Sequence, residues 1–209
     1  MTNHEKSLSM SLLERDLVPD WLIRRQIRQL LAQRLAEEDK GDPESQQRHL
    51  MAMVSKLRES PIAVHTAEAN VQHYEVPTEF YLKTLGRHLK YSSCYFDDLD
   101  ISRAAQNLDA AEARMLALTC ERAALKDGDR ILELGCGWGS LSLWMAAHYP
   151  NSRITVVSNS KTQKAHIDRQ AAARGLTNLE VVTCDVNDLD FPSSEKFDRV
   201  VSVEMFEHM

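Results

Sequence analysis

Apolar and polar residues alternate along the first sixty positions with the period of a helix. Between Leu22 and Leu35 apolar side chains recur every three or four residues, which predicts an amphipathic helix. Gly41-Asp42-Pro43 interrupts the pattern, and a second helix is predicted from Pro43 to about Glu59, because proline favours the first turn of a helix. The first helix carries four arginines, and acidic residues follow it. Packing on its own domain is therefore favoured over a position on a membrane surface.

From residue 126 onward short apolar segments alternate with helical patterns. Strands that alternate with helices of this length are typical of parallel β-α-β units. The predicted strands are 130–134, 153–157, 179–183 and 199–203, and the predicted helices are 138–148 and 161–174. The fold class is therefore α/β, with a Rossmann-like, doubly wound sheet.

This pattern also predicts the domain organisation. Residues 1–125 form an N-terminal helical or cap region, which includes an aromatic-rich segment at 73–96 and a helix over about 104–124. Residues 126–209 form the first half of the α/β core. The sequence stops directly after its fourth strand, whereas such domains normally continue with further strands. We therefore expect a sheet that is incomplete here and a chain truncated at its C-terminus, with the outer edge of the fourth strand unpaired.

Composition and charge narrow the classes of protein. The 209 residues are 43% hydrophobic and 27% charged, and no apolar run approaches the ~20 residues needed to cross a bilayer. The net charge of −6 disfavours nucleic acid as a partner, because phosphates attract a surplus of Lys and Arg. The four cysteines lack metal-ligand spacing, and no secretory signal is visible. We expect a soluble cytoplasmic protein with free thiols and no metal site.

A glycine-rich turn follows the first predicted strand. Gly135, Gly137 and Gly139 let the backbone turn sharply and pass close to a ligand, and the N–H groups of the next helix favour an anionic group. A dinucleotide site would have GxGxxG and an acidic residue after the second strand, where Ser158-Asn159-Ser160 stands. Nicotinamide chemistry is therefore disfavoured, while a turn that serves packing alone stays open.

Polar residues also follow the second and third strands. Asp185 can accept the exocyclic N–H of an adenine while the N–H of Val186 donates to a ring nitrogen, or Asp185 can simply cap the following loop. Gln163 can complete a capping box with Ser160, or it can reach the hydroxyls of a ribose. The glycine turn favours the ligand-binding alternative for Asp185. For Gln163 the sequence leaves both alternatives open.

Five segments in order make a family resemblance specific. They are HYEVPTEFY, LKYSSCYF, ERAALKDGDRILELGCGWGSLSLWMA, SNSKTQKAHID and VSVEMFEHM. Over about residues 73–209 the chain resembles the cyclopropane-fatty-acid-synthase superfamily of S-adenosylmethionine-dependent methyltransferases, and within it the coclaurine N-methyltransferase-like branch. The resemblance implies a class I methyltransferase fold and S-adenosyl-L-methionine as cofactor.

The resemblance further implies roles for individual residues. Those implied to surround the methionine part of the cofactor are Tyr91, Ser92, Gly135, Cys136 and Gly137; Asn159 and Gln163 are implied to lie by the ribose, and Asp185 and Val186 by the adenine. Glu204, Glu207 and His208 are the candidate catalytic residues. They stand at the end of the fourth strand, where α/β sheets place ligands, and the pair Glu207-His208 is implied to face a substrate amine.

Methylation of an amine would explain the candidate catalytic residues Glu204, Glu207 and His208. Methyl transfer is an in-line displacement in which the enzyme mainly orients the nucleophile, and an amine attacks only when it is unprotonated. A carboxylate and an imidazole, with unperturbed pKa values of ~4.3 and ~6.5, can take up or relay that proton. The predicted activity is methyl transfer to an amine nitrogen of a small apolar or aromatic substrate. A homodimer is compatible with it.

Two alternatives remain open. Cyclopropane synthases carry a Cys two residues after the Tyr of LKYSSCYF, where it helps to hold a bicarbonate base; here that position is Ser93, and Cys94 follows. This departure weakens a reaction on unsaturated acyl chains of phospholipids but does not remove it. The second alternative is a cofactor-binding or regulatory protein without catalysis, in which Glu207 and His208 merely begin a helix.

Overall fold

The computed structural model describes residues 8–64, 77–91, 93–97, 100–192 and 194–206. The chain divides into two compact units, Met1–Glu59 and Ser60–Met209. The predicted division into a cap region and a core at residue 125 stays a prediction. Within the described ranges, no helix combines the length and the apolar character that a membrane span requires.

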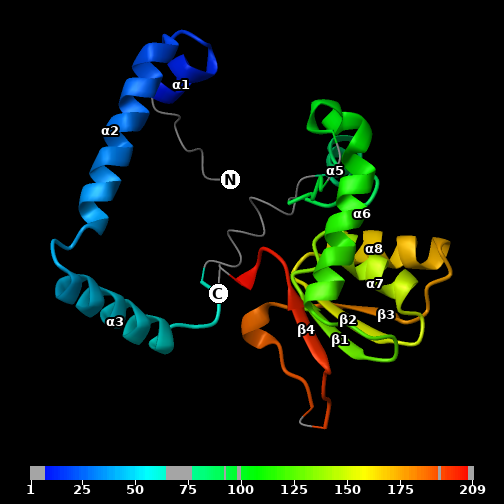
Figure 1. Ribbon diagram of the computed structural model, residues 1–209. Helices are drawn as coiled ribbons and strands as arrows, with labels where there is room; N and C mark the ends of the chain where they lie inside the picture. Colours follow the sequence, from blue (N-terminus) through cyan, green and yellow to red (C-terminus); the bar gives the residue numbers. More distant parts are fainter. Residues whose placement is uncertain (1–7, 65–76, 92, 98–99, 193, 207–209) are drawn as a thin grey trace. The chain divides into compact units, whose positions relative to one another are not determined.

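The first unit is a succession of helices, α1 (Leu8–Glu14), α2 (Asp20–Glu38) and α3 (Pro43–Glu59) (Figure 1). The last two confirm the predicted helices. Helix α3 begins at Pro43, and its first turn is capped because Asp42 Oδ1 accepts a hydrogen bond from Ser45 N at 2.9 Å. Neither α2 nor α3 buries a residue, and Trp21 is 65% exposed. The apolar stripe of α2 therefore lies on the surface.

The second unit is built on a parallel sheet of four strands in the order β3-β2-β1-β4 (Figure 1). The strands are β1 (Arg130–Leu134), β2 (Arg153–Ser158), β3 (Leu179–Thr183) and β4 (Arg199–Ser202). All four predicted strands are confirmed within one residue at each end, and so is the α/β class. Strand β4 pairs only with β1 within the described residues, so its outer edge carries no strand there.

The helices of this unit are α5 (Thr78–Thr84), α6 (Ala104–Arg122), α7 (Ser140–His148) and α8 (Lys161–Ala173), with short 3-10 turns at η1 (Ile101–Arg103) and η2 (Val186–Asp188). Figure 1 shows α6, α7 and α8 gathered on one side of the sheet. Alternate strand residues such as Ile131 and Val156 pack there with Leu116, Met145 and Ile167 in one buried cluster. This core holds the carboxyl ends of the strands, where the candidate residues lie.

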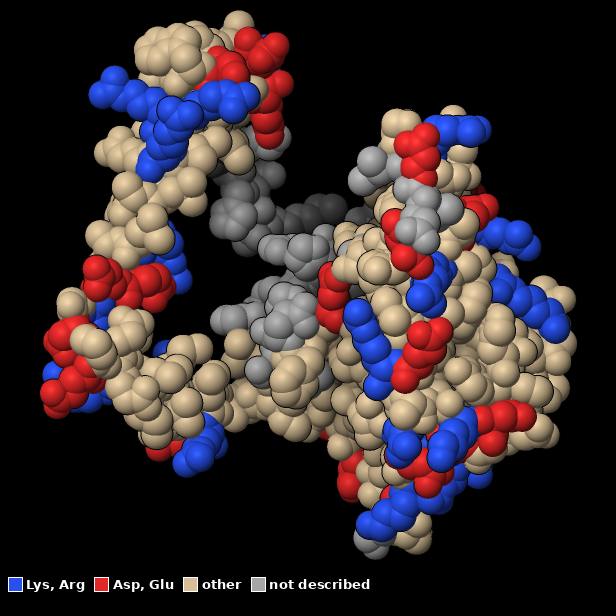
Figure 2. All heavy atoms as spheres, in the orientation of Figure 1, with Lys and Arg blue, Asp and Glu red and all other residues tan. Residues whose placement is uncertain are grey.

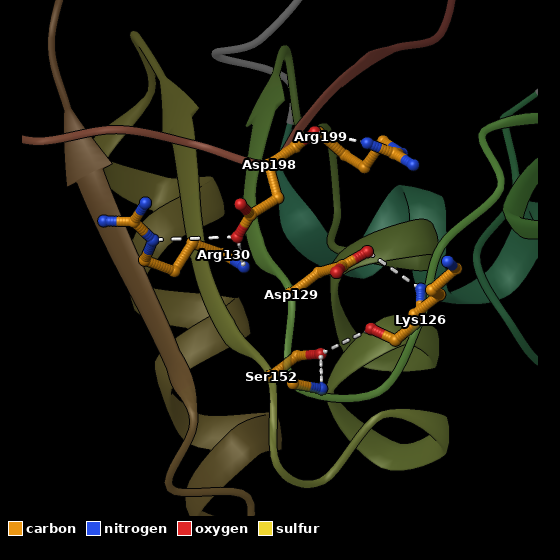
Figure 3. Close-up of polar contacts among 7 residues, drawn as sticks. Lys126, Asp129, Arg130, Ser152, Asp198 and Arg199 are labelled. Atoms are coloured by element: carbon orange, nitrogen blue, oxygen red, sulfur yellow. Dashed lines mark hydrogen bonds and ion pairs between the residues drawn. The ribbon is translucent and has the colours of Figure 1, made fainter.

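Polar contacts tie the amino ends of the strands together (Figure 3). Asp198 Oδ2 accepts a hydrogen bond from Arg130 N at 2.8 Å, and this bond holds the pKa of the Asp198 carboxyl below its usual value. Lys126 N donates to Asp129 Oδ2 at 2.9 Å, and Ser152 Oγ donates to Lys126 O at 3.3 Å. The starts of β1, β2 and β4 are thereby fixed relative to one another.

The visible surface of the second unit mixes charges of both signs. Figure 2 shows Lys and Arg side chains interspersed with Asp and Glu, rather than gathered in a single patch. Arg114, for example, lies 3.3 Å from both Asp97 Oδ2 and Glu121 Oε1. Exposed pairs of this kind contribute little to stability, about 0–1 kcal/mol each.

Candidate functional site

The turn between β1 and α7 has the backbone that its glycines predict. Gly135, Gly137 and Gly139 have φ angles of +77°, +51° and +82°, in the left-handed region that L-residues rarely adopt. Val157 O, at the end of β2, accepts hydrogen bonds from Gly135 N at 3.0 Å and Cys136 N at 3.1 Å. Helix α7 begins at Ser140, two residues later than predicted, because Gly139 stands at its N-cap.

The three glycines serve different purposes. A Cβ on Gly139 would lie 2.7 Å from Ile167 Cγ1, so this glycine allows α8 to pack closely against the turn. A Cβ on Gly135 would lie 2.6 Å from Met205 Sδ, which comes from the segment after β4. A Cβ on Gly137 would meet nothing within 4 Å. Packing thus explains Gly139 and Gly135, whereas the open space beside Gly137 leaves room for a ligand.

Glu133, a buried residue of β1 two positions before Gly135, supports the glycine turn. Its side chain is 3% exposed, and its Oε2 accepts a hydrogen bond from Ser142 Oγ at 2.5 Å, which ties β1 to α7. Burial raises the pKa of Glu133 to about 7, although the bond from Ser142 acts in the opposite direction. Glu133 is therefore buried between the sheet and α7, where its bond to Ser142 fixes the helix relative to the strand on either side of the turn.

A row of rings connects the turn to the aromatic-rich segment. The ring of Trp138 is buried and lies 5.0 Å from that of Tyr81, measured between centroids, and 5.6 Å from that of His166. Tyr81 in turn lies 5.9 Å from Tyr91, whose side chain is 69% exposed. Tyr81 therefore links Tyr91 to the glycine turn, and the contact of Tyr91 with a cofactor stays a prediction. The supporting rings, Trp138 and Tyr81, were not predicted as part of the site.

His166 is the buried end of this row. Burial lowers its pKa, and the charges of Arg169 and Arg174 lower it further. Its Nε2 has no hydrogen-bond partner within the described part of the chain. A neutral imidazole that packs edge-on against Trp138 suits this environment.

The end of β2 is built around serine hydroxyls. Ser160 Oγ accepts a hydrogen bond from Gln163 N at 3.3 Å, so Ser160 caps α8 as its position predicts. The side chain of Gln163 does not complete the capping box, because its Oε1 accepts a bond from Ser158 Oγ at 2.6 Å instead. Gln163 is 2% exposed, and the adjacent Asn159 is half-buried. Their contact with a ribose stays a prediction.

The end of β3 carries Asp185, which caps η2. Its Oδ1 accepts a hydrogen bond from Asn187 N at 2.9 Å, so the capping alternative is confirmed for one carboxylate oxygen. Asn187 also exchanges two bonds of 2.9 Å with the backbone of Ala63, which brings residues 61–64 to this edge of the sheet. Contact of Asp185 and Val186 with an adenine stays a prediction.

The end of β4 brings two distant segments together. Ser93 Oγ donates a hydrogen bond to Glu204 Oε1 at 2.8 Å, across 111 positions of sequence. Ser93 and Glu204 both have positive φ angles, +58° and +54°, which is uncommon for residues other than glycine and concentrates at functional sites. Ser92, Glu207 and His208 lie outside the described residues.

Comparison with known proteins identifies the family. The model of the family described as "Mycolic acid cyclopropane synthetase" matches residues 63–209, which is more than half of the chain. The chain belongs to this family.

Members with curated names divide between two chemistries. (S)-coclaurine N-methyltransferase from Thalictrum flavum subsp. glaucum is 42% identical over 94% of this chain and 53% of its own length. Cyclopropane-fatty-acyl-phospholipid synthase from Escherichia coli strain K12 is 35% identical over 66% of this chain and 32% of its own length. The chain spans about half the length of the N-methyltransferases it matches.

Solved structures of the family have the same fold. The crystal structure of a coclaurine N-methyltransferase bound to N-methylheliamine and SAH superimposes with a TM-score of 0.82 at 39% identity, over 95% of this chain and 55% of that one. The mycolic acid cyclopropane synthase CmaA1, complexed with SAH and CTAB, gives a TM-score of 0.58 at 26% identity, over 70% of this chain and 48% of that one. The second unit therefore has the class I methyltransferase fold.

The fold of this family places the described candidates along one edge of the sheet. Gly135, Cys136 and Gly137 follow β1, while Asn159 and Gln163 follow β2; Asp185 and Val186 follow β3, and Glu204 follows β4. Because the four strands are parallel, all their carboxyl ends meet at that edge. Met205 against Gly135 and Ser93 against Glu204 show that this edge continues from the glycine turn to the end of β4.

Proposed function

We propose that the protein transfers the methyl group of S-adenosyl-L-methionine to an amine nitrogen of a small apolar or aromatic substrate. The observation that carries the proposal is the Glu204 carboxylate, fixed by Ser93 at the same sheet edge as the glycine turn. N-methyltransferases that act on alkaloids are similar to most of this chain. One solved relative holds SAH, the product that S-adenosylmethionine leaves after methyl transfer, together with a methylated amine.

The residues at this edge suit S-adenosylmethionine. The open space beside Gly137 can take the methionine part against Tyr91 and Ser92, and the N-terminus of α7 suits its carboxylate. Asn159 and Gln163, at the end of β2, can hold the ribose. Asp185 and Val186, at the end of β3, can recognise the adenine. The residues proposed for the adenine, the ribose and the methionine part follow β3, β2 and β1, which are neighbours in the sheet in that order. Their order therefore matches the order of the three parts in the cofactor.

When bound, the sulfonium of S-adenosylmethionine supplies an already activated methyl group. The protein's contribution is to orient the amine for in-line attack and to keep it unprotonated. The Glu204 carboxylate attracts a cationic amine to the end of β4, and the hydrogen bond from Ser93 holds this carboxylate in one orientation. Glu207 and His208, three and four residues further along the chain, are proposed to receive the proton that the amine loses.

Heliamine and methyl-labelled S-adenosylmethionine test this proposal directly. We expect label to appear in N-methylheliamine, and we expect Glu207→Ala to lower the rate about 100-fold or more, because general bases contribute about 10²–10⁴. Glu195→Ala is a matched control, since Glu195 is an exposed carboxylate near the amino ends of the strands. Full turnover in Glu207→Ala would remove the role given to Glu207, and no label in any amine would overturn the proposed function.

Modification of unsaturated acyl chains in phospholipid is the second candidate, because the family model and the Escherichia coli relative carry that chemistry in their names. Ser93, at the position where cyclopropane synthases carry Cys, is occupied with Glu204 instead, and this favours the amine. Bicarbonate-dependent incorporation of label into vesicles of unsaturated phospholipid, without incorporation into heliamine, would reverse that preference.

Three further predictions belong to this function. Residues 1–125 act as the cap region and 126–209 as the α/β core of the methyltransferase. The protein works in the cytoplasm, and a homodimer is compatible with its activity. Light scattering on the purified protein measures the oligomeric state, and fractionation of cells that express it measures the location.

A further inference from the structure

A completely buried glutamate on α6 binds the backbone that leads into Tyr91. Glu112 is 0% exposed; its Oε2 accepts a hydrogen bond from His88 N at 2.8 Å, and its Oε1 accepts one from Lys90 N at 3.2 Å. Asp109, one turn earlier on α6, accepts a bond from Arg87 N at 3.1 Å. Three N–H groups within four residues therefore point at two carboxylates of one helix.

The backbone of this segment is shaped around the Glu112 carboxylate. A Cβ on Gly86 would lie 2.7 Å from Cδ and from both oxygens of Glu112, so any larger residue there would displace the carboxylate. Leu89 has a φ angle of +52°, in the left-handed region. Backbone N–H groups that converge in this way form a concavity for an anion. Here a side chain of the same protein fills it.

The stretch from Lys90 to Tyr95 is consequently held at both ends by adjacent residues of α6. Lys90 N binds Glu112, and Tyr95 N donates to Ala111 O at 3.1 Å. Between these anchors lie Tyr91, whose ring is 5.9 Å from that of Tyr81, and Ser93, bonded to Glu204. The described residues of this stretch, 90, 91 and 93–95, are called the arch; they include Tyr91, proposed to face the cofactor, and Ser93, bonded to the Glu204 carboxylate that is proposed to face the amine.

We propose that Glu112 is a positioning residue for the cofactor site, which it orders through the arch. This inference rests on the proposed function. An arch that is already fixed loses less conformational freedom when a ligand binds, so the buried carboxylate raises the affinity for the cofactor and its product without touching either. A purely structural residue at this position would need only to fill space, whereas one oxygen of Glu112 binds Lys90 N, at the start of the arch, and the other binds His88 N, two residues before it.

Calorimetric titration of the chain with SAH tests the inference. We expect Glu112→Ala to weaken SAH binding about tenfold or more, because two bonds to a charged acceptor are lost. Glu112→Gln should fall between, since its carbonyl oxygen can accept one N–H while its amide group faces the other. Leu116→Ala, one turn further on α6 and 2% exposed, is the matched control. It should lower Tm but leave the SAH affinity within about twofold, as expected for sites without shared partners.

Amide hydrogen exchange distinguishes local loosening of the segment around residues 88–90 from a loss of global stability. The amides of His88 and Lys90 should exchange faster in either Glu112 variant while those of β1 and β2 stay protected; if Glu112→Ala does not fold, Glu112→Gln carries the test. Equal SAH affinity in the unaltered chain and the Glu112 variants would overturn the inference alone, as would an equal loss in Leu116→Ala. A failure of the unaltered chain to bind SAH would overturn the proposed function and the inference together.

Discussion

The glycine turn and the end of β4 lie along one edge of the sheet but are held in different ways. The turn consists of consecutive residues whose backbone bonds to Val157 and whose Trp138 and Glu133 are buried. At the end of β4 a side-chain bond joins Glu204 to Ser93, 111 positions away in sequence, and both residues have positive φ angles. The first region is part of the core, and the second is attached to it.

This difference fits a division of work between binding and substrate choice. A cofactor that is common to a whole family needs a binding site of constant geometry, and burial of the residues around the turn makes that site rigid. The Glu204 carboxylate, which we propose faces the substrate, can be reoriented by changing Ser93 alone, without disturbing the core. We therefore expect substitutions at the turn to reduce stability, and substitutions at Ser93 to change turnover with little loss of stability.

Breaking the turn itself should have the largest effect. Gly139→Ala places a Cβ 2.7 Å from Ile167 Cγ1 at a φ angle of +82°, so strain and overpacking add. We expect the free energy of unfolding to fall by about 3 kcal/mol in a urea titration. Gly128→Ala is the control, since Gly128 has a φ angle of +101° but nothing within 4 Å of its Cβ position, and it should cost about 1 kcal/mol. Equal losses in the two variants would mean that close packing at Gly139 is unimportant.

The buried Glu133 under the turn should make stability depend on pH. Its pKa is about 7 in the folded chain against an ordinary value of 4.5 for a glutamate, so between these values the folded state holds a proton that the unfolded state has released. The contribution of Glu133 to stability should therefore be fully present below about pH 4.5, fall by about 3 kcal/mol as the pH rises towards 7, and level off above it.

Glu133→Gln isolates this contribution, because its amide keeps the acceptor for Ser142 but does not titrate. Urea titrations between pH 4.5 and 7 should show a flatter dependence in this variant than in the unaltered chain. Ser142→Ala should act in the opposite sense, since the hydrogen bond that lowers the pKa of Glu133 is lost and the decline extends to higher pH. An identical slope in Glu133→Gln would show that other groups cause the dependence.

Local sequence patterns predicted the elements of this fold well, because each is determined by its own residues. The short apolar run at Arg130–Leu134 and the glycines after it were sufficient to place β1 and its turn. The bonds of Ser93 and Glu112 were not predicted, since each joins residues that only the tertiary fold brings together. A glutamate on the buried face of the helix at 104–122 was the one signal available for Glu112.

The candidate site divides in the same way. Gln163 and Asp185 were each open to a capping or a ligand-binding interpretation, and the structure uses both residues in local hydrogen bonds. Local bonds of this kind do not compete with a ligand for every polar atom of a side chain, so sequence and geometry together still leave the ligand contacts as predictions. The tilted ring contact between Tyr81 and Trp138 was not predicted, because an aromatic residue gives no signal in the sequence of which ring it will contact.

Changing Ser93 should have the smallest effect on stability and the most selective effect on function. Ser93→Ala removes the bond to Glu204, so we expect the rate with heliamine to fall about tenfold, since a carboxylate that is misplaced by a fraction of an ångström orients the amine less well. Ser93→Gly removes the same bond but suits the φ angle of +58°, and it should be about 1 kcal/mol more stable than Ser93→Ala. Both variants should bind SAH within about twofold of the unaltered chain, because the turn is intact. A loss of SAH affinity as large as the loss of rate would show that the glycine turn and the end of β4 act as one site. The difference drawn between a rigid cofactor region and an adjustable substrate region would then be wrong.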